Sequence, residues 1–322
     1  PVFVGDDEVY FLAPGGEGSA GAQVWRGALR GDGTLADLHQ VTQLTREVGG
    51  FEVSPNGESL AIFGNVPRGC AQFDCPDAAA TATGSGRLYD NEDGFVRHWD
   101  TWETPDVFSR VFVFPLSGGK ARGPGVAVDG PDGEGALVGD TPLQPFGGLE
   151  DMAWSPDGKT LYFLSARNEQ KSQLWALNLE TGGEAQQVTE FERGINQLNF
   201  SSDEKKLLLV LRDEDNSEPL VEGSNPWVID RLDFKKDADG TYLNRLRRHV
   251  YIYDIAEKEL TQITSGDFDD SDPAWSPDDS QVAFTSFRDP GDSYNSDILL
   301  VDAKTGATPR QLTTNRGADS SP

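Results

Sequence analysis

The feature that most constrains this fold is a short turn sequence that recurs along the chain. Each copy resembles Ser-Pro-Asp-Gly and follows a short apolar stretch. Proline presets the backbone for the first turn position, and Asp, Asn and Gly tolerate the geometry that reverses a hairpin. The turns begin at Ser54, Ser155, Ser201 and Ser276, and a degenerate fifth copy opens the chain at Pro1. The chain is therefore predicted to be built from structural repeats.

Each turn is followed by three short apolar runs, rich in Val, Leu, Phe, Tyr and Trp, which are typical of β-strands. In four of the five copies the third run closes on a threonine, as in Gln311-Leu-Thr313, and the second copy lacks this signature. No stretch shows a sustained helical period with caps at both ends. Four strands per repeat are typical of a propeller blade. We therefore predict an all-β fold: a β-propeller of four-stranded WD40-like blades, with about five repeats present.

The repeats define the expected domain organisation. One propeller domain is predicted over residues 1–322, with repeats at about 1–45, 46–128, 147–190, 194–264 and 271–313. Two long insertions are expected at about 66–109 and 213–248, and loops of this length inside a compact fold are often functional. Residues 319–322 match the lead-in at 270–273, so we expect a further repeat and read the chain as a piece of a longer protein.

The charge of the chain limits its partners. Its 54 acidic and 27 basic residues give a formal net charge of −27. Phosphate backbones and anionic membrane surfaces are repelled by such a chain, so we expect no nucleic acid partner. No apolar run is long enough to suggest membrane insertion. The excess of acidic residues favours solubility, or alternatively indicates a preference for cationic ligands. The sequence leaves the oligomeric state open.

The two cysteines lie close together in a predicted loop. Cys70 and Cys75 have a spacing that allows a small disulfide, although two free thiols are an equal alternative. A disulfide would indicate an oxidising compartment, so we expect a periplasmic or secreted protein without excluding the cytoplasm. The three histidines are scattered along the sequence, so no zinc site, other metal site or cofactor is predicted.

The first insertion contains the strongest local group of candidate substrate-binding residues. The string RHWDTW supplies Arg97, His98, Trp99, Asp100 and Trp102. Aromatic rings at a propeller rim could cover a bound peptide, and Arg or Asp could anchor its terminus. Alternatively, the tryptophans pack the insertion onto its blade while the charged residues pair locally.

A second candidate is an acidic pair ahead of the third repeat. Glu150 precedes a predicted inner strand, and a carboxylate at that place could bind the amino group of a peptide. The alternative is an exposed acidic loop. The aspartates at 267, 269, 270 and 272 do not have the spacing of an EF-hand loop and are interpreted as turn residues.

Three segments carry a resemblance to a known family. Residues 89–102, 266–289 and 310–322 resemble the propellers of prolyl-oligopeptidase-family (S9) serine peptidases of the dipeptidyl-peptidase-5 and acylaminoacyl-peptidase type. The repeats resemble the PD40 class, which TolB-type proteins share. The resemblance implies a roughly seven-bladed propeller capping an α/β-hydrolase domain that supplies the catalytic Ser, Asp and His. No G-x-S-x-G elbow occurs in this sequence, so no catalytic residue is placed on it.

The resemblance predicts a function and leaves an alternative. The chain would be the substrate-gating propeller of an S9 peptidase, with a short peptide and the hydrolase domain as its partners. The alternative is a TolB-like, non-catalytic propeller that binds a protein. A sugar- or metal-dependent propeller enzyme is disfavoured because the sequence has no His-rich ligand set. The RHWDTW insertion favours the peptidase.

Overall fold

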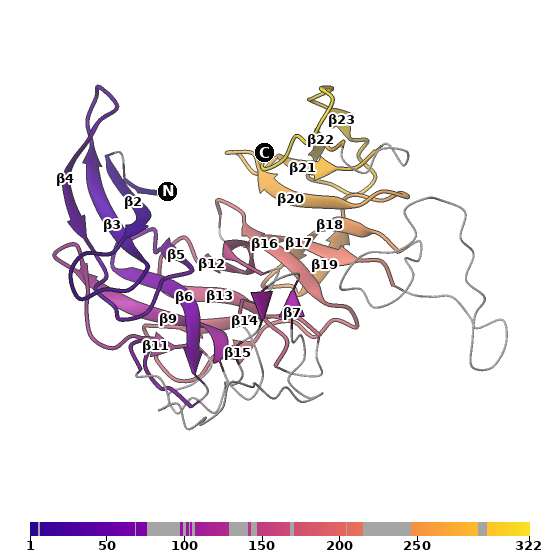
Figure 1. The fold of residues 1–322 in the computed structure, drawn as a ribbon. Helices are drawn as coiled ribbons and strands as arrows, with labels where there is room; N and C mark the ends of the chain where they lie inside the picture. Colours follow the sequence, from indigo (N-terminus) through magenta and orange to yellow (C-terminus); the bar gives the residue numbers. More distant parts are fainter. Residues whose placement is uncertain are drawn as a thin grey trace. The chain divides into compact units, whose positions relative to one another are not determined.

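The computed structural model describes residues 1–5, 7–67, 69–75, 97–98, 101–102, 104, 107–128, 141–142, 147–167, 171–203, 205–214, 246–288 and 295–322. The chain divides into two compact units, Pro1–Glu190 and Phe191–Pro322. Each unit is described by itself, and Figure 1 shows the strands of both.

Among the described residues, the Pro1–Glu190 unit contains three antiparallel sheets of four or five strands, in which the strands mostly follow one another in chain order, and a separate two-stranded sheet of β7 (Arg97–His98) and β8 (Thr101–Trp102). Sheet 1 consists of β1 (Val2–Val4), β2 (Glu8–Pro14), β3 (Ala22–Leu29) and β4 (Leu35–Gln40). Sheet 2 consists of β5 (Gly50–Val53), β6 (Ser59–Pro67), β9 (Val107–Ser117), β10 (Lys120–Ala121) and β11 (Val126–Ala127). Sheet 3 consists of β12 (Met152–Trp154), β13 (Thr160–Ser165), β14 (Gln173–Asn178) and β15 (Gln186–Gln187).

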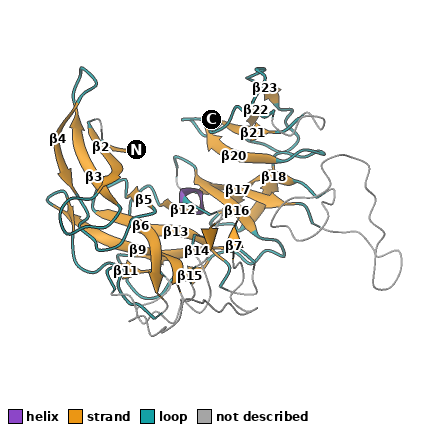
Figure 2. Ribbon diagram, in the orientation of Figure 1, coloured by secondary structure: helices purple, strands orange, loops and turns teal. Residues whose placement is uncertain are grey.

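The Phe191–Pro322 unit contains two further four-stranded antiparallel sheets. Sheet 4 consists of β16 (Ile195–Phe200), β17 (Lys206–Arg212), β18 (Arg248–Asp254) and β19 (Glu259–Gln262). Sheet 5 consists of β20 (Asp270–Trp275), β21 (Gln281–Ser286), β22 (Asp297–Asp302) and β23 (Arg310–Gln311). The predicted all-β fold is confirmed, because the described part of the chain contains one helical element, the short η2 (Leu149–Asp151), among its strands (Figure 2).

Apolar cores form between neighbouring sheets because strand residues alternate between two faces. In sheet 2, Leu60 and Ile62 join a cluster with Tyr10 of sheet 1, whereas Ala61 joins a cluster with Trp154 and Phe163 of sheet 3. Sheet 2 is therefore covered on both faces. In the second unit, sheets 4 and 5 share one cluster, to which each contributes strand residues. Its buried members are Leu208, Val250, Ile252, Ile263, Val282, Phe284, Leu299 and Val301.

The recurring turn has the same hydrogen bonds in four sheets. In the turn of sheet 5, the Ser276 hydroxyl donates to Asp278 Oδ1 at 2.7 Å and accepts the Gln281 N–H at 2.9 Å. The turns that begin at Ser54, Ser155 and Ser201 repeat both contacts. The residue after the Asp, or after Asn56 in sheet 2, has a positive φ in three turns: Gly57, Gly158 and Asp279. A positive φ favours glycine. The repeated sequence is thus explained by local turn chemistry.

The turn aspartates make stability sensitive to acid. The Ser276 hydroxyl, followed by the Ser280 side chain and backbone, lowers the pKa of Asp278 to about 2. A carboxyl whose folded pKa is depressed contributes stability above its unfolded pKa, and that contribution is lost as pH falls from about 4 towards 2. Asp278→Asn should keep the turn, because Asn56 fills the same position in sheet 2, but should lose this pH dependence. Acid titrations of stability that coincide for both proteins would contradict this role.

The threonine signature also has a structural explanation. The hydroxyl oxygen of Thr264 accepts the Val250 N–H at 2.9 Å, next to the start of β18. In sheets 1, 3 and 5, a backbone N–H of the third strand donates in the same way to the hydroxyl oxygens of Thr42, Thr189 and Thr313. In the first copy, the threonine that accepts this hydrogen bond is Thr42. Sheet 2 lacks the threonine, and in β9 the buried Arg110 donates instead to the Cys70 carbonyl.

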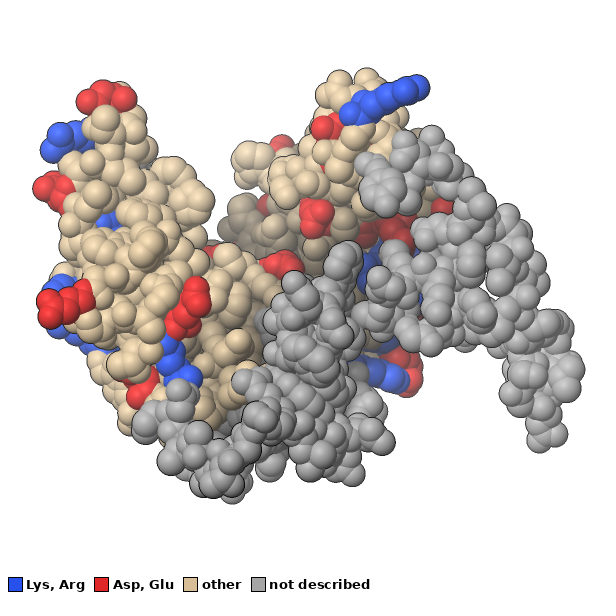
Figure 3. Space-filling model, viewed as in Figure 1, with Lys and Arg blue, Asp and Glu red and all other residues tan. Residues whose placement is uncertain are grey.

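Among the described residues on the face drawn in Figure 3, acidic and basic side chains are dispersed between uncharged ones. In the described residues, no helix is long and apolar enough to cross a membrane.

Candidate functional site

Cys70 and Cys75 form a disulfide. The loop it closes is tied to the first unit by Arg46, whose Nε donates to the Cys75 carbonyl at 2.9 Å. Between the cysteines, the fully buried Phe73 packs edge-on against Phe112, with ring centroids 5.5 Å apart. The beginning of the predicted 66–109 insertion is therefore fixed to sheet 2.

Removal of this disulfide should reduce stability. In the chain-entropy account, a cross-link that closes so short a loop contributes about 2 kcal/mol. The double variant Cys70→Ala/Cys75→Ala should therefore unfold at lower urea than the wild type under oxidising conditions. In reductant the difference should shrink. A variant that unfolds at the wild-type midpoint without reductant would show that Phe73 and the arginines hold the loop unaided.

The RHWDTW string is only partly described. Arg97–His98 (β7) and Thr101–Trp102 (β8) form a two-stranded antiparallel hairpin, in which Arg97 pairs with Trp102. Trp99 and Asp100 lie outside the described residues. The assignment of these five residues to peptide binding therefore stays a prediction.

In the first unit, the first strands of the three sheets lie next to one another. β5 contacts both β1 and β12, and each of these is an edge strand of its sheet. The Trp154 Nε1–H of β12 donates to the Glu52 carbonyl of β5 at 3.3 Å. These adjacent first strands form what we call the inner wall. Glu52, Glu150 and Asp151, which lie on or next to it, are called the inner-wall site.

Glu52 is the unusual residue of the inner-wall site. Its neighbours in β5, Phe51 and Val53, point into the apolar core, and alternation turns Glu52 to the other face. In the part of the chain that is described, no hydrogen bond or ion pair reaches its carboxylate. Burial raises the pKa of Glu52 to about 7. Glu52 is therefore poised to ionise near neutral pH, which a cationic ligand would favour.

Glu150 and Asp151 belong to η2, which contacts both β5 and β12. Glu150 is exposed, whereas Asp151 is buried. The helix thus places the predicted Glu150 on an element that packs against the strand of Glu52. Glu52 and Glu150, which lie on adjacent elements, could together bind an ammonium group.

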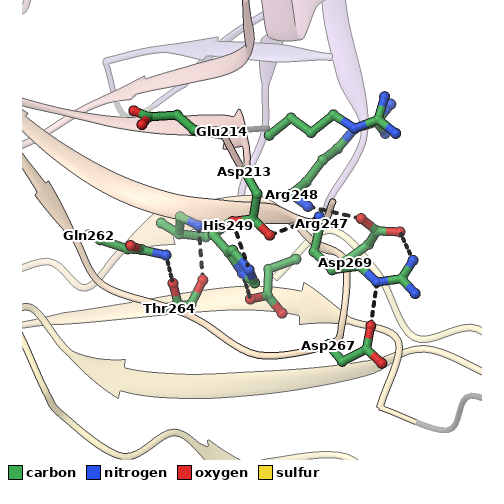
Figure 4. A network of polar contacts seen from close by, with 12 residues as sticks. Asp213, Glu214, Arg247, Arg248, His249, Gln262, Thr264, Asp267 and Asp269 are labelled. Atoms are coloured by element: carbon green, nitrogen blue, oxygen red, sulfur yellow. Dashed lines mark hydrogen bonds and ion pairs between the residues drawn. The ribbon is translucent and has the colours of Figure 1, made fainter. Parts of the chain in front are cut away.

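A second group of polar residues lies in the other unit, where β17 ends and β18 begins (Figure 4). Asp213 and Arg247 form two hydrogen bonds with each other. The Asp213 N–H donates to the Arg247 carbonyl at 2.7 Å, and the Arg247 N–H donates to the side-chain atom Asp213 Oδ2 at 3.0 Å. Arg247 Nε lies 2.9 Å from Asp267 Oδ1, and the Arg248 N–H donates to Asp269 Oδ1. These contacts hold together the two chain segments that border the predicted 213–248 insertion.

Asp270 is the buried centre of this polar group. Its side chain is fully buried and accepts a 2.5 Å hydrogen bond from the Ser286 hydroxyl. His249 Nδ1 lies 3.2 Å from Asp270 Oδ2, and Arg288 Nη2 lies 3.6 Å from Oδ1. Arg288 also stacks on Phe268, 4.5 Å from the ring centroid. Arg288 thus binds an Asp of its own sheet.

This group contains Ser, His and Asp but is not arranged as a catalytic triad. A nucleophilic serine must donate to the histidine, whereas Ser286 donates to Asp270. The described residues also contain no cluster of three or more His, Cys, Asp or Glu side chains arranged to bind a metal. The geometry therefore indicates a structural role.

The sequence analysis did not single out Glu52 or His249 as candidate site residues, although the sequence contains a signal for each. Glu52 is a charged residue inside an otherwise apolar inner strand, Gly50–Val53. His249 occupies a polar position that recurs at the start of the third strand, as Gln23, Gln173 and Asp297 do in other sheets.

Comparison with known proteins places the chain near peptidases. No family model matches it. It is 29% identical over 229 residues to dipeptidyl-peptidase 5 of Aspergillus fumigatus, covering 68% of this chain and 29% of that protein. It is 24% identical over 285 residues to dipeptidyl-peptidase 5 of Porphyromonas gingivalis, covering 80% of this chain and 39% of that protein. The uncharacterized peptidase YuxL of Bacillus subtilis is 29% identical over 142 residues, covering 42% of this chain and 21% of YuxL.

One solved structure indicates a shared fold, and a second is reported for comparison. A puromycin hydrolase mutant is similar with a TM-score of 0.50 and 12% identity, over 97% of this chain and 36% of that one. TolB from Acinetobacter baumannii is similar with a TM-score of 0.49 and 14% identity, over 98% of this chain and 53% of TolB. The sequence matches confirm the predicted resemblance to dipeptidyl-peptidase-5-type proteins. The chain spans between about a fifth and two fifths of the length of these curated relatives.

Proposed function

We propose that this chain is the substrate-gating propeller of an S9-family serine peptidase of the dipeptidyl or acylaminoacyl type, which acts on short peptides. The observation that carries the proposal is the similarity to dipeptidyl-peptidase 5, which extends over most of the chain in two relatives. The five antiparallel sheets agree with it. In the complete protein we expect a roughly seven-bladed propeller, with the repeat boundaries given above.

The chemical step is assigned to a hydrolase domain outside this sequence. The sequence has no G-x-S-x-G elbow, and Ser286 is engaged by a buried carboxylate. Acyl transfer needs a serine activated by a histidine. The propeller would act before that step, by admitting short or unfolded peptides and by holding one end of them.

The inner-wall site supports this holding role. A peptide's amino group is a cation at neutral pH, and a partly buried carboxylate binds such a group more strongly than an exposed one. Glu52 supplies a carboxylate that has no partner among the described residues, and η2 brings Glu150 to the neighbouring element. Arg97, His98, Trp99, Asp100 and Trp102 are proposed to contact the rest of the peptide. The disulfide supports a periplasmic or secreted location.

Two observations test the proposal. The gene that encodes this chain should continue for roughly 250 codons beyond Pro322 and include a G-x-S-x-G elbow, since hydrolase domains have about that size. The chain alone should not cleave aminoacyl or dipeptidyl chromogenic substrates. A stop codon soon after Pro322 would favour a binding propeller without a catalytic domain. Turnover by the chain alone, blocked by a serine-directed reagent, would show that it carries its own nucleophile.

A further inference from the structure

We propose that Asn56 is a modification site, at which the side-chain amide is lost as ammonia and the turn between β5 and β6 gains a carboxylate. Asparagine is one of the chemically labile residues of proteins. Asn56 is followed by Gly57, and this is the one Asn-Gly pair in the sequence. Glycine has no Cβ to hinder attack of its backbone nitrogen on the preceding side chain. Asn56 is also exposed, so water and base can reach it.

The reaction consumes water and releases ammonia. The Gly57 backbone nitrogen loses its proton to base and bonds to Asn56 Cγ, and the Cγ–Nδ2 bond breaks as Nδ2 takes up a proton and leaves as ammonia. Water then opens the cyclic succinimide that has formed. Attack of water at Cγ gives aspartate with the normal backbone. Attack at the main-chain carbonyl carbon gives isoaspartate, in which the backbone runs through the side chain and is longer.

The folded turn slows this reaction without preventing it. The Gly57 N–H donates to the Ser54 carbonyl at 2.8 Å, and this bond must open before the nitrogen can give its proton to base. Asn56 Oδ1 accepts the Ser54 hydroxyl at 2.7 Å and the Glu58 N–H at 3.0 Å, which hold the side chain in place. An exposed turn opens locally at a much smaller cost in free energy than the whole sheet. Conversion therefore proceeds in the folded chain, and faster in the unfolded one.

The aspartate product changes a contact between two sheets. Asn56 Nδ2 donates to the Asp157 carbonyl at 3.1 Å, in the turn of sheet 3. A Cβ placed on Gly158 would lie 2.6 Å from the same Nδ2, so the amide packs directly on that turn. An ionised carboxylate has no proton to donate to the carbonyl. Within its own turn a carboxylate is tolerated, because Asp157 accepts the equivalent bonds from Ser155 and Lys159. Conversion to aspartate thus weakens the contact between sheets 2 and 3 and keeps the turn.

Peptide mass spectrometry of the full chain after incubation at mildly alkaline pH tests the site. In the folded chain, Asn56 should lose its amide faster than Asn199, a matched control that is also exposed but is followed by Phe200. In urea, conversion at Asn56 should be at least about tenfold faster than in the folded chain, because the hydrogen bonds of the turn are gone. Equal rates at Asn56 and Asn199 in the folded chain would overturn the proposed site.

The variant Asn56→Asp tests the consequence without waiting for the reaction. Hydrogen exchange at the Gly158 amide, in the contacted turn, should be about fivefold faster than in the wild type, the effect of one lost hydrogen bond. The Glu58 amide should exchange at the wild-type rate, because the side chain at position 56 still accepts it. The Asp279 amide, in the equivalent turn of the other unit, serves as the control. Equal exchange at Gly158 in the two proteins would show that the modification leaves the contact between the sheets intact, contrary to the proposal.

Discussion

Replacing Asp270 with alanine should destabilise the Phe191–Pro322 unit by about 3–5 kcal/mol, the usual cost of removing one partner of a buried ion pair. Asp270 is fully buried and is the shared partner of Ser286, His249 and Arg288. Its removal would leave the Ser286 hydroxyl, the His249 ring and the Arg288 guanidinium facing a cavity from which water is largely excluded. The loss should appear as faster hydrogen exchange along β20 and β21 and a lower urea midpoint.

A matched variant separates this effect from a general loss of acidic charge. Asp267 also forms an ion pair in the same group, but half of its side chain is exposed. Exposed pairs contribute about 0–1 kcal/mol, so Asp267→Ala should change stability by no more than that. If Asp270→Ala and Asp267→Ala had similar small effects, Asp270 would not be the centre of the group.

Replacing Glu52 with glutamine should stabilise the Pro1–Glu190 unit at neutral and alkaline pH. The pKa of Glu52 is raised to about 7 by burial, so the folded chain holds a proton that the unfolded chain releases. Wild-type stability should therefore fall as pH rises from about 4.5 to about 7. The variant has no such ionisation and should be more stable by about 2 kcal/mol at pH 8, a figure reduced from the full pKa difference because the side chain is partly exposed.

The control for this prediction is Glu150→Gln, because Glu150 is exposed. Urea unfolding at a series of pH values should show a flatter profile for Glu52→Gln and the wild-type profile for Glu150→Gln. Equal slopes for Glu52→Gln and the wild type would mean that Glu52 is solvated enough to ionise at its ordinary pKa.

The sequence predicts the sheets well because their determinants are local. The turn at Ser276 depends on Asp278 and Gln281, only a few residues away. The four-strand order follows from hairpins between consecutive strands. The threonine signature was also visible, although its role in holding the third strand emerges only when Thr264 is seen beside Val250.

The sites are harder to predict because their residues meet through packing of distant segments. Glu52 is unusual only because β12 and η2 cover it, and both come about a hundred residues later. His249 lies between Asp213 and Asp270, which the sequence separates by an insertion and a hairpin. The sequence predicts Glu150 as a candidate from its place ahead of a strand, whereas its proximity to β5 depends on tertiary structure.

The most direct test of the central claim is a calorimetric titration of this chain with a dipeptide that has a free amino group and with its N-acetylated form. We expect acetylation or Glu52→Gln to weaken binding at least tenfold, the effect of losing one charge-assisted hydrogen bond. Binding of the free peptide should also strengthen as pH rises through about 7, because Glu52 then ionises. Equal affinity for the two peptides, unaffected by Glu52→Gln, would contradict a role for the inner wall in holding the amino end of a substrate.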